Sequence, residues 1–160
     1  PLFFIPKMKK ELVEHYVLEA LSEDSSLFLI DLEILQDNKI AIVIDGDNGV
    51  PLNECIRVSR AVEGNLDREE EDFSLEVSSP DITKPLKVKR QYAKNKGRTL
   101  KVKTQEESFE GKLEEVSDEG ILLTWKTREP KPLGKGKVTV EKKENITYNN
   151  IVEAKVKLIF

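Results

Sequence analysis

The chain has little of what enzymes and disulfide-stabilised proteins need: its 160 residues include one cysteine, one histidine and one tryptophan. One cysteine cannot form an internal disulfide, which is typical of proteins kept in the reducing cytoplasm. The chain also lacks a phosphate-binding glycine loop, a nucleophile elbow and a metal-ligand cluster. We therefore expect a cytoplasmic protein that is not an enzyme, with no catalytic residue, no metal and no cofactor.

Long apolar runs are missing as well. The stretch Leu2–Ile5 lies between two prolines and is far too short for a secretion signal or a membrane span. We expect no membrane partner, we base nothing on residues 1–7, and Met8 is a candidate natural start. A hydrophobic content of 38% with 35% charged residues indicates a soluble globular chain with a modest core.

The charge balance reverses along the chain. Residues 1–84 contain 8 Lys or Arg residues and 19 Asp or Glu residues, a net charge of −11. Residues 85–160 contain 18 and 11, a net charge of +7. Two prolines, Pro80 and Pro85, interrupt regular structure at the same place. These features predict an acidic domain over residues 1–84 and a basic domain over residues 85–160.

The acidic half reads as an α+β layer. Apolar spacing predicts helices over residues 7–21 and 51–66, and alternation predicts a hairpin over 27–44 and a strand over 73–77. In the hairpin we expect one buried face made by Phe28, Ile30, Leu32 and Ile34. In the second helix we expect one apolar stripe, in which Cys55 is a small hydrophobe, formed by Leu52, Cys55, Val58, Ser59, Val62 and Leu66. Two helices should then cover one face of a three-stranded sheet.

The basic half reads as a short helix followed by strands. Residues 85–96 predict a basic helix, with Gly97 in the position of a C-terminal cap. Five strand-like runs follow, and Gly111 within the second predicts a sharp bend. The glycines and prolines between Arg128 and Lys137 predict a long mobile loop. Five short strands in such a length favour a small SH3-like or Sm-like β-barrel.

Two short patterns suggest chemistry but have plainer explanations. Residues 45–49 resemble the start of a calcium loop, yet Val50 and Ile56 stand where that loop needs glycine and glutamate. His15 with Ser78 and Ser79 could suggest a hydrolase. His15, however, lies on a predicted helix, and serines in a turn bond mostly to local backbone. We interpret residues 45–49 as a strand-to-helix loop and none of these side chains as catalytic.

Several stretches together resemble the RimP family of ribosome maturation factors. They are Glu54–Arg60 on the second helix, Leu75–Pro80 at the boundary, Pro85–Leu86 after it, and the tail from Ile146 to Phe160. The resemblance covers nearly the whole chain from about Leu12. It implies an N-terminal KH-like α+β domain (αββαβ) and a C-terminal Sm-like barrel. It also implies a cytoplasmic assembly factor that binds the immature small (30S) ribosomal subunit and helps a basic ribosomal protein to dock.

The chain departs from the family at one place. Gly-Leu-Asp-Arg is usual where Asp81, Ile82, Thr83 and Lys84 stand here. Asp81 tolerates a left-handed backbone better than most residues, though less well than glycine, and Thr83 could cap a helix that begins near Pro85. Lys84 keeps a positive charge without the two-pronged geometry of arginine. A role that depends on the usual Asp-Arg pair is therefore not expected.

The charges suggest two kinds of contact. An acidic domain suits a basic ribosomal protein, whereas the basic residues after the boundary suit RNA phosphates or protein. The predicted partner-binding residues are Ser78, Ser79, Lys84, Lys87, Lys89, Arg90, Lys94, Lys96, Arg98, Lys131, Lys135 and Lys137. For any single lysine the alternative is a solvated surface position. Tyr92 and Trp125 are expected in the core and not as platforms for bases.

We expect a monomer that binds the small ribosomal subunit through a ribosomal protein, with rRNA as a further contact. The alternative is a general RNA-binding module of Sm-like or KH-like type. Against it, the first half lacks the GXXG loop with which KH domains clamp a nucleic-acid backbone.

Overall fold

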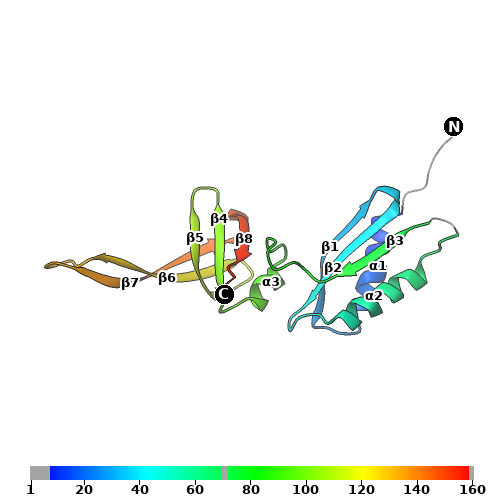
Figure 1. The fold of residues 1–160 in the computed structure, drawn as a ribbon, viewed down its shortest axis with the longest axis horizontal. Coiled ribbons are helices and arrows are strands. Elements are labelled where there is room, and N and C mark those ends of the chain that lie inside the picture. Colours follow the sequence, from blue (N-terminus) through cyan, green and yellow to red (C-terminus); the bar gives the residue numbers. More distant parts are fainter. Residues whose placement is uncertain (1–7, 70–71, 159–160) are drawn as a thin grey trace. The chain divides into compact units, whose positions relative to one another are not determined.

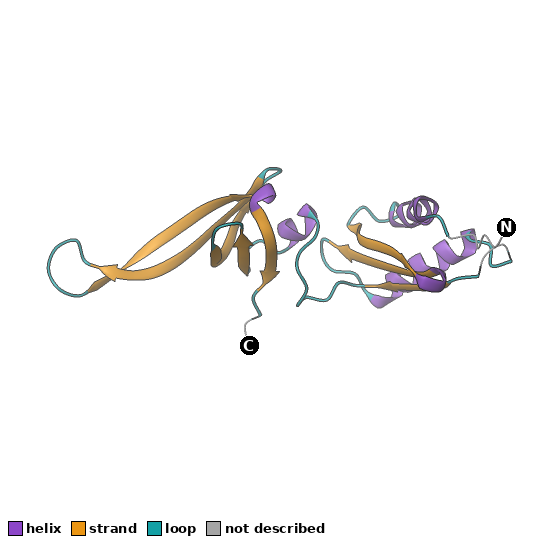
Figure 2. Ribbon diagram, turned by 90° about the horizontal axis from the view of Figure 1, so that it is seen from above, coloured by secondary structure: helices purple, strands orange, loops and turns teal. Residues whose placement is uncertain are grey.

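The computed structural model describes residues 8–69 and 72–158. Residues 70–71 of the charged connector and the terminal pair Ile159–Phe160 of the family-like tail lie outside this part. The chain divides into two compact units, residues 1–81 and 82–160. The first unit combines helices with strands and the second is mostly strand (Figure 1, Figure 2), so the predicted α+β class is confirmed.

The first unit has the predicted order of elements. They are α1 (Lys10–Leu21), β1 (Leu27–Leu35), β2 (Lys39–Gly46), α2 (Leu52–Asn65) and β3 (Ser74–Ser78). The sheet order is β1-β2-β3, with β1 antiparallel and β3 parallel to the central β2. A short 3-10 turn, Gln36–Asn38, joins β1 to β2, and both Asp37 and Asn38 have positive φ. Asp and Asn tolerate that conformation, which matches the twist of a hairpin.

One core holds the two helices against one face of the sheet. Its central side chains are less than 2% exposed and come from α1, α2 and β2: Val13, Val17, Val58, Val62, Ile40, Ile42 and Ile44. Cys55 is buried in the same core, as predicted. Burying such side chains contributes about 1.5–3 kcal/mol each before the entropy cost of ordering them. The apolar faces predicted from the helical and alternating patterns of the sequence therefore pack together in one core.

The predicted face of β1 is wrong in its first half. Leu29 pairs with Ile44 and Asp31 pairs with Val43, so Ile30 is an extra residue in a β-bulge. Before the bulge Leu29 faces the core, and after it Leu32 does. Phe28 pairs with Asp45 and lies on the other face of the sheet. The bulge shifts the alternation by one residue, so Phe28 and Ile30 do not share a face with Leu32 and Ile34.

The stripe predicted on α2 begins later than expected. Leu52 is 75% exposed because it is the first residue of the helix and Pro51 occupies the N-cap. Cys55, Val58 and Val62 are buried as predicted.

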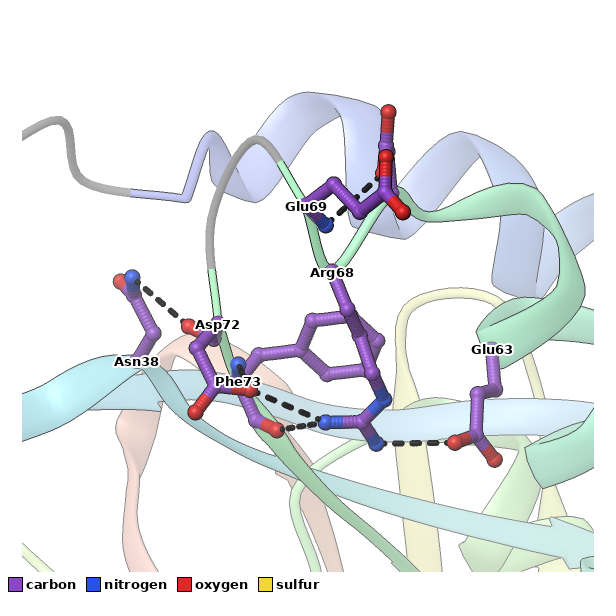
Figure 3. Close-up of polar contacts among 7 residues, drawn as sticks. Asn38, Glu63, Arg68, Glu69, Asp72 and Phe73 are labelled. Atoms are coloured by element: carbon purple, nitrogen blue, oxygen red, sulfur yellow. Dashed lines mark hydrogen bonds and ion pairs between the residues drawn. The ribbon is translucent and has the colours of Figure 1, made fainter.

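Arg68 fastens the connector between α2 and β3 (Figure 3). Its guanidinium lies 4.1 Å from the centre of the Phe73 ring and donates to the Phe73 carbonyl at 2.6 Å. It also donates to Glu63 at 2.8 Å and to Asp72 at 3.2 Å. Asn38 of the β1–β2 turn donates to the Asp72 carbonyl at 3.3 Å. Arg68 thus ties the end of α2 to the start of β3.

The second unit begins with a helix and continues as an antiparallel sheet. Its elements are α3 (Lys89–Lys94), β4 (Thr99–Thr104), β5 (Ser108–Val116), β6 (Gly120–Pro130), β7 (Lys137–Thr147) and β8 (Ile151–Val156), with a 3-10 turn at Tyr148–Asn150. The five strands predicted are present, in the order β7-β6-β5-β4-β8. Among the described residues no pairing joins β7 to β8, which would close the ladder. The core contains Leu100, Val102, Leu113 and Leu123.

The helix α3 is shorter than predicted and is capped differently. The side-chain oxygen of Gln91 accepts hydrogen bonds from the backbone N–H groups of Lys87 and Val88 at 2.6 and 3.0 Å. Thr83 therefore does not cap a helix that begins near Pro85, because α3 begins at Lys89. Gly97 follows with a φ of +94°, as its predicted place after the helix requires.

Gly111 of β5 allows a close approach between strands. A Cβ at this position would lie 2.8 Å from the carbonyl oxygen of Thr124 on β6. The register between β5 and β6 shifts after Leu113, two residues further on. A side chain at position 111 would push the two strands apart where the sheet changes register.

The predicted loop between Arg128 and Lys137 is too long. β6 and β7 stay paired as far as Pro130 and Lys137, so only residues 131–136 connect them. β5 pairs with β6 no further than Thr124. Among the described residues, β6 pairs only with β7 from residue 125 onward, and Pro130 is tolerated there because it lies at the end of a strand with a free edge.

Candidate functional site

The basic residues predicted around α3 fall into two groups. Lys89 donates from its Nζ to the Asp118 carbonyl at 2.7 Å and lies 5.2 Å from the centre of the Tyr148 ring. Lys96 and Arg98 follow the helix and are exposed. Three further residues, Lys87, Arg90 and Lys94, lie on or just before the helix and have interactions of their own. The structure therefore assigns Lys89 to holding α3 on its unit, whereas Lys96 and Arg98 face solvent.

The three lysines predicted on the loop gather at the end of the β6–β7 hairpin. Lys131 and Lys135 lie in the connection of residues 131–136, and Lys137 is the first residue of β7. All three are exposed. Leu133, at the tip between them, is 89% exposed.

The boundary residues lie at the end of β3 and just after it. Ser78 is the last residue of β3 and pairs with Val43, while Ser79 and Lys84 are exposed. Within residues 8–69 and 72–158, neither serine hydroxyl has a hydrogen-bond partner, so the predicted bonds to local backbone are wrong. Asp81 is not among the described residues with positive φ.

The family-like stretch on α2 serves the fold. Glu54 accepts from the Arg57 Nε at 2.7 Å, and Arg57 also donates to the Ala20 carbonyl at the end of α1 at 3.0 Å. Cys55 and Val58 are buried in the core. Burial raises the pKa of the Cys55 thiol, which keeps it protonated and unreactive.

The aromatic residues of the second unit belong to the core, as predicted. Tyr92 of α3 is 5% exposed and meets Tyr148 edge-on, with ring centres 5.2 Å apart. Burial raises the pKa of Tyr92 to about 12. Trp125 is half-buried and lies 5.9 Å from Phe109, measured between ring centres. A base could not stack on Tyr92 without opening this packing.

One surface missed by the sequence argument is the face of the first sheet opposite the helices, which we call the open face. Register places three carboxylates on it, those of Asp31 and Glu33 from β1 and Glu76 from β3. Ala41 and Val43 of β2 lie between them. The alternation of acidic residues with core residues along β1 and β3 could have revealed this face. The bulge at Ile30 interrupts that alternation just before Asp31, so the sequence pattern is unclear there.

The second missed surface is the β6–β7 hairpin beyond the body of the sheet. Residues 125–142 contain six Lys or Arg residues and two Glu residues, a net charge of +4. Lys126, Arg128 and Lys142 were not predicted as contacts. They could have been found by continuing the alternation of β6 past Trp125, but the proline and glycine cluster suggested a loop instead.

Within residues 8–69 and 72–158, no three His, Cys, Asp or Glu side chains lie together in a way that could hold a metal ion. In the same residues, no helix combines the length and the apolar character needed to cross a membrane.

Comparisons with known proteins agree over nearly the whole length. The family model of the RimP N-terminal domain matches residues 17–83. The ribosome maturation factor RimP of Christiangramia forsetii is 56% identical over 153 residues, covering 96% of this chain and 100% of the relative. That of Flavobacterium psychrophilum is 54% identical over 94% of this chain and 98% of the relative. The ribosome maturation factor RimP of Cytophaga hutchinsonii is 38% identical, covering 72% of this chain and 74% of the relative. The chain belongs to the RimP family.

Proposed function

We propose that this protein acts in ribosome maturation, as a cytoplasmic and non-enzymatic assembly factor for the small (30S) ribosomal subunit. The names of its relatives, ribosome maturation factor RimP, support the general role. The more specific part, docking of a basic ribosomal protein, is supported by the charge reversal between the two halves of the chain. We propose that the protein works as a monomer.

The proposal assigns one task to each half of the chain. Residues 1–84 form an acidic domain of KH-like topology, supported by the order helix, strand, strand, helix, strand. Residues 85–160 form a basic Sm-like domain, supported by a helix followed by five antiparallel strands. The first domain meets protein and the second meets RNA or protein.

The open face is the observation that best supports a contact with a basic ribosomal protein. Asp31, Glu33 and Glu76 project from one side of a sheet whose other side is filled by the core. Ala41 and Val43, both partly buried, provide small apolar surface between the carboxylates. Ribosomal proteins are strongly basic, and complementary charge speeds their association and disfavours wrong partners. The same carboxylates would repel RNA phosphates that come within the range of unscreened charge interactions.

In the basic domain, we propose that the residues predicted from the sequence to bind a partner contact the small subunit. The exposed ones include Lys96 and Arg98 after α3 and Lys131, Lys135 and Lys137 on the hairpin. Phosphate contacts of this kind position a protein without reading sequence.

Co-sedimentation tests the proposed function. At low salt the protein should travel with free small subunits in a sucrose gradient and not with large ones. The double variant Glu33→Gln, Glu76→Gln should weaken this binding. The matched control is Glu11→Gln, Glu14→Gln on the exposed side of α1, which changes net charge equally. Equal binding to both subunits, or none, would refute the proposal, and equal loss in both double variants would refute the role of the open face.

The second candidate function is a general RNA-binding module, favoured by the net charge of +7 in residues 85–160. It predicts tight binding to unrelated single-stranded RNA, with affinity falling steeply as salt rises. Weak binding to such RNA, together with selective travel with small subunits, separates the two functions.

A further inference from the structure

Beyond Trp125, which packs against Phe109, the end of the β6–β7 hairpin is built without a core. Beyond Thr124, β6 pairs only with β7, over six residue pairs from Trp125–Lys142 to Pro130–Lys137. Figure 1 shows these strands continuing as a twisted two-stranded ribbon past the end of β5. We call residues 125–142 the arm. A two-stranded ribbon is marginally stable by itself, so burial of apolar surface does not account for its length.

The two faces of the arm have different chemistry. Register places Trp125, Thr127, Val138 and Val140 on one face, which we call the apolar face. The ion pair between Glu129 and Lys142, at 3.0 Å, belongs to the same face and neutralises its charges.

The opposite face, which we call the basic face, carries Lys126, Arg128 and Lys137. Its other residues are Pro130, Thr139 and Glu141. It therefore bears three positive charges and one negative charge, and it has no aromatic and no large aliphatic side chain.

The cations of the basic face lack acidic partners. Arg128 donates to the Thr139 hydroxyl at 3.2 Å, and Glu141 lies directly across from Lys126 in the register. Among the described residues, no carboxylate forms an ion pair with Lys126, Arg128 or Lys137. Three lysines of the body of the sheet differ, because each forms an ion pair: Lys112 with Glu114, Lys155 with Glu153 and Lys157 with Glu110, at 3.4, 3.1 and 2.8 Å.

These features fit a polyanion with regularly spaced charges. Residues two apart on one strand, such as Lys126 and Arg128, are separated by about 6.8 Å, which is close to the distance between successive phosphates of a nucleic-acid strand. A protein partner would need a large apolar or aromatic anchor, which the basic face does not offer. Phosphates need only cations and hydroxyl donors, and Thr139 provides a hydroxyl. The shallow minor groove of an RNA helix leaves the phosphates on both sides accessible to a narrow ribbon.

We propose that the basic face of the arm binds the phosphate backbone of double-helical RNA without reading its bases. The inference rests on the proposed function in that the natural RNA would be that of the small ribosomal subunit. It adds Lys126 and Arg128 to the contacts, and it assigns binding to one face of a paired two-stranded ribbon in place of a loop.

The test compares two triple variants with equal changes of charge. The arm variant is Lys126→Gln, Arg128→Gln, Lys137→Gln, and the control is Lys112→Gln, Lys155→Gln, Lys157→Gln in the body of the sheet. Binding to a labelled RNA stem of about two helical turns is measured by fluorescence anisotropy over a series of salt concentrations. Each phosphate contact contributes roughly 0.7–0.9 to the slope of log affinity against log salt, so the arm variant should lose about two units of slope.

The following results support or overturn the binding of RNA by the basic face. The control should keep the slope of the wild type, and a stem of scrambled sequence should bind as well as the original. An unchanged slope in the arm variant would overturn the proposal and leave the cations only the task of preventing association of the free strand edges. Loss of slope in both variants would show that net charge, and not the basic face, governs binding. Circular dichroism and thermal unfolding verify that each variant is folded.

Sedimentation with subunits separates this proposal from the proposed function. If the wild type travels with small subunits and the arm variant binds both subunits and RNA normally, the arm proposal fails and the function stands. If the wild type does not travel with small subunits but its RNA binding depends on the arm, the function fails and the arm proposal stands.

Discussion

The two units of the chain bury their sheets differently. In the first, two helices cover one face of three strands, and the other face presents carboxylates. In the second, strands supply most of the core, α3 adds Tyr92, and one hairpin continues beyond the core. Leu123 and Val138 illustrate the contrast within that hairpin, since they are 0% and 39% exposed. Hydrogen-bonded pairing can therefore extend a strand past the point where apolar burial ends.

The difference in charge follows the difference in architecture. The acidic residues of the open face alternate with core residues on β1 and β3, whereas the arm has cations on a ribbon with no core behind it. A covered sheet offers a firm surface to a protein, and an uncovered ribbon offers a narrow strip to a strand of phosphates. Both surfaces result from the same period-two alternation of side chains.

The largest effect should come from the core end of the β6–β7 hairpin. Leu123→Ala should lower the free energy of unfolding by about 3 kcal/mol, because it leaves a cavity in a fully packed core. Val138→Ala, in the arm, should lower it by less than about 0.5 kcal/mol. Urea denaturation followed by circular dichroism measures both. Similar losses of stability in the two variants would mean that Val138 is packed as tightly as Leu123, and that the arm has a core of its own.

Alkaline pH should weaken the second unit through Tyr92. Its pKa is about 12 in the folded chain, whereas an unfolded tyrosine ionises near pH 10. The stabilisation from the buried neutral hydroxyl is therefore complete below about pH 10 and is lost as pH rises towards 12, by roughly 2–3 kcal/mol at most. Denaturation of the wild type and of Tyr92→Phe at several pH values isolates this term. Parallel pH curves for the two proteins would contradict the prediction.

Two glycines should respond in opposite directions to substitution by alanine. A Cβ at Gly120, where β6 begins, would lie 2.2 Å from the Ile146 carbonyl oxygen, so Gly120→Ala should destabilise the second unit by about 2 kcal/mol. A Cβ at Gly64 in α2 meets no atom within 4 Å. Gly64→Ala should stabilise the first unit by about 0.5–1 kcal/mol, because alanine favours a helix. Thermal unfolding compares them, and a destabilising Gly64→Ala would show that the first unit is more tightly packed there than its open surroundings indicate.

The smallest effect concerns Cys55 and reports on the first unit alone. Its thiol is buried and its pKa is raised, so a thiol reagent at neutral pH should react at least about tenfold more slowly than with the unfolded chain. Leu123→Ala should leave that protection in place if the two units unfold separately. Rapid labelling of Cys55 in the Leu123→Ala variant, at a denaturant concentration where the wild type is protected, would show that they unfold together.

Sequence periodicity was informative wherever it ran without interruption. The helices α1 and α2 and the strands β2, β4 and β5 were predicted, because helical and strand alternation are local properties of the residues themselves. The charge reversal also predicted which half would offer anions and which cations. The core positions of Tyr92 and Trp125 were predicted from the usual place of aromatic residues in small folds of strands.

The chain by itself thus determined the order of its elements, most of their apolar faces and the sign of the charge on each half. Only the tertiary structure decided the bulge at Ile30 and the pairing of Arg128 with Thr139 across the arm. Both depend on a neighbouring strand that folding brings close, through cross-strand hydrogen bonds. A one-residue bulge reverses the faces of a strand, and pairing made possible by a neighbouring strand overrides the loop signal of prolines and glycines.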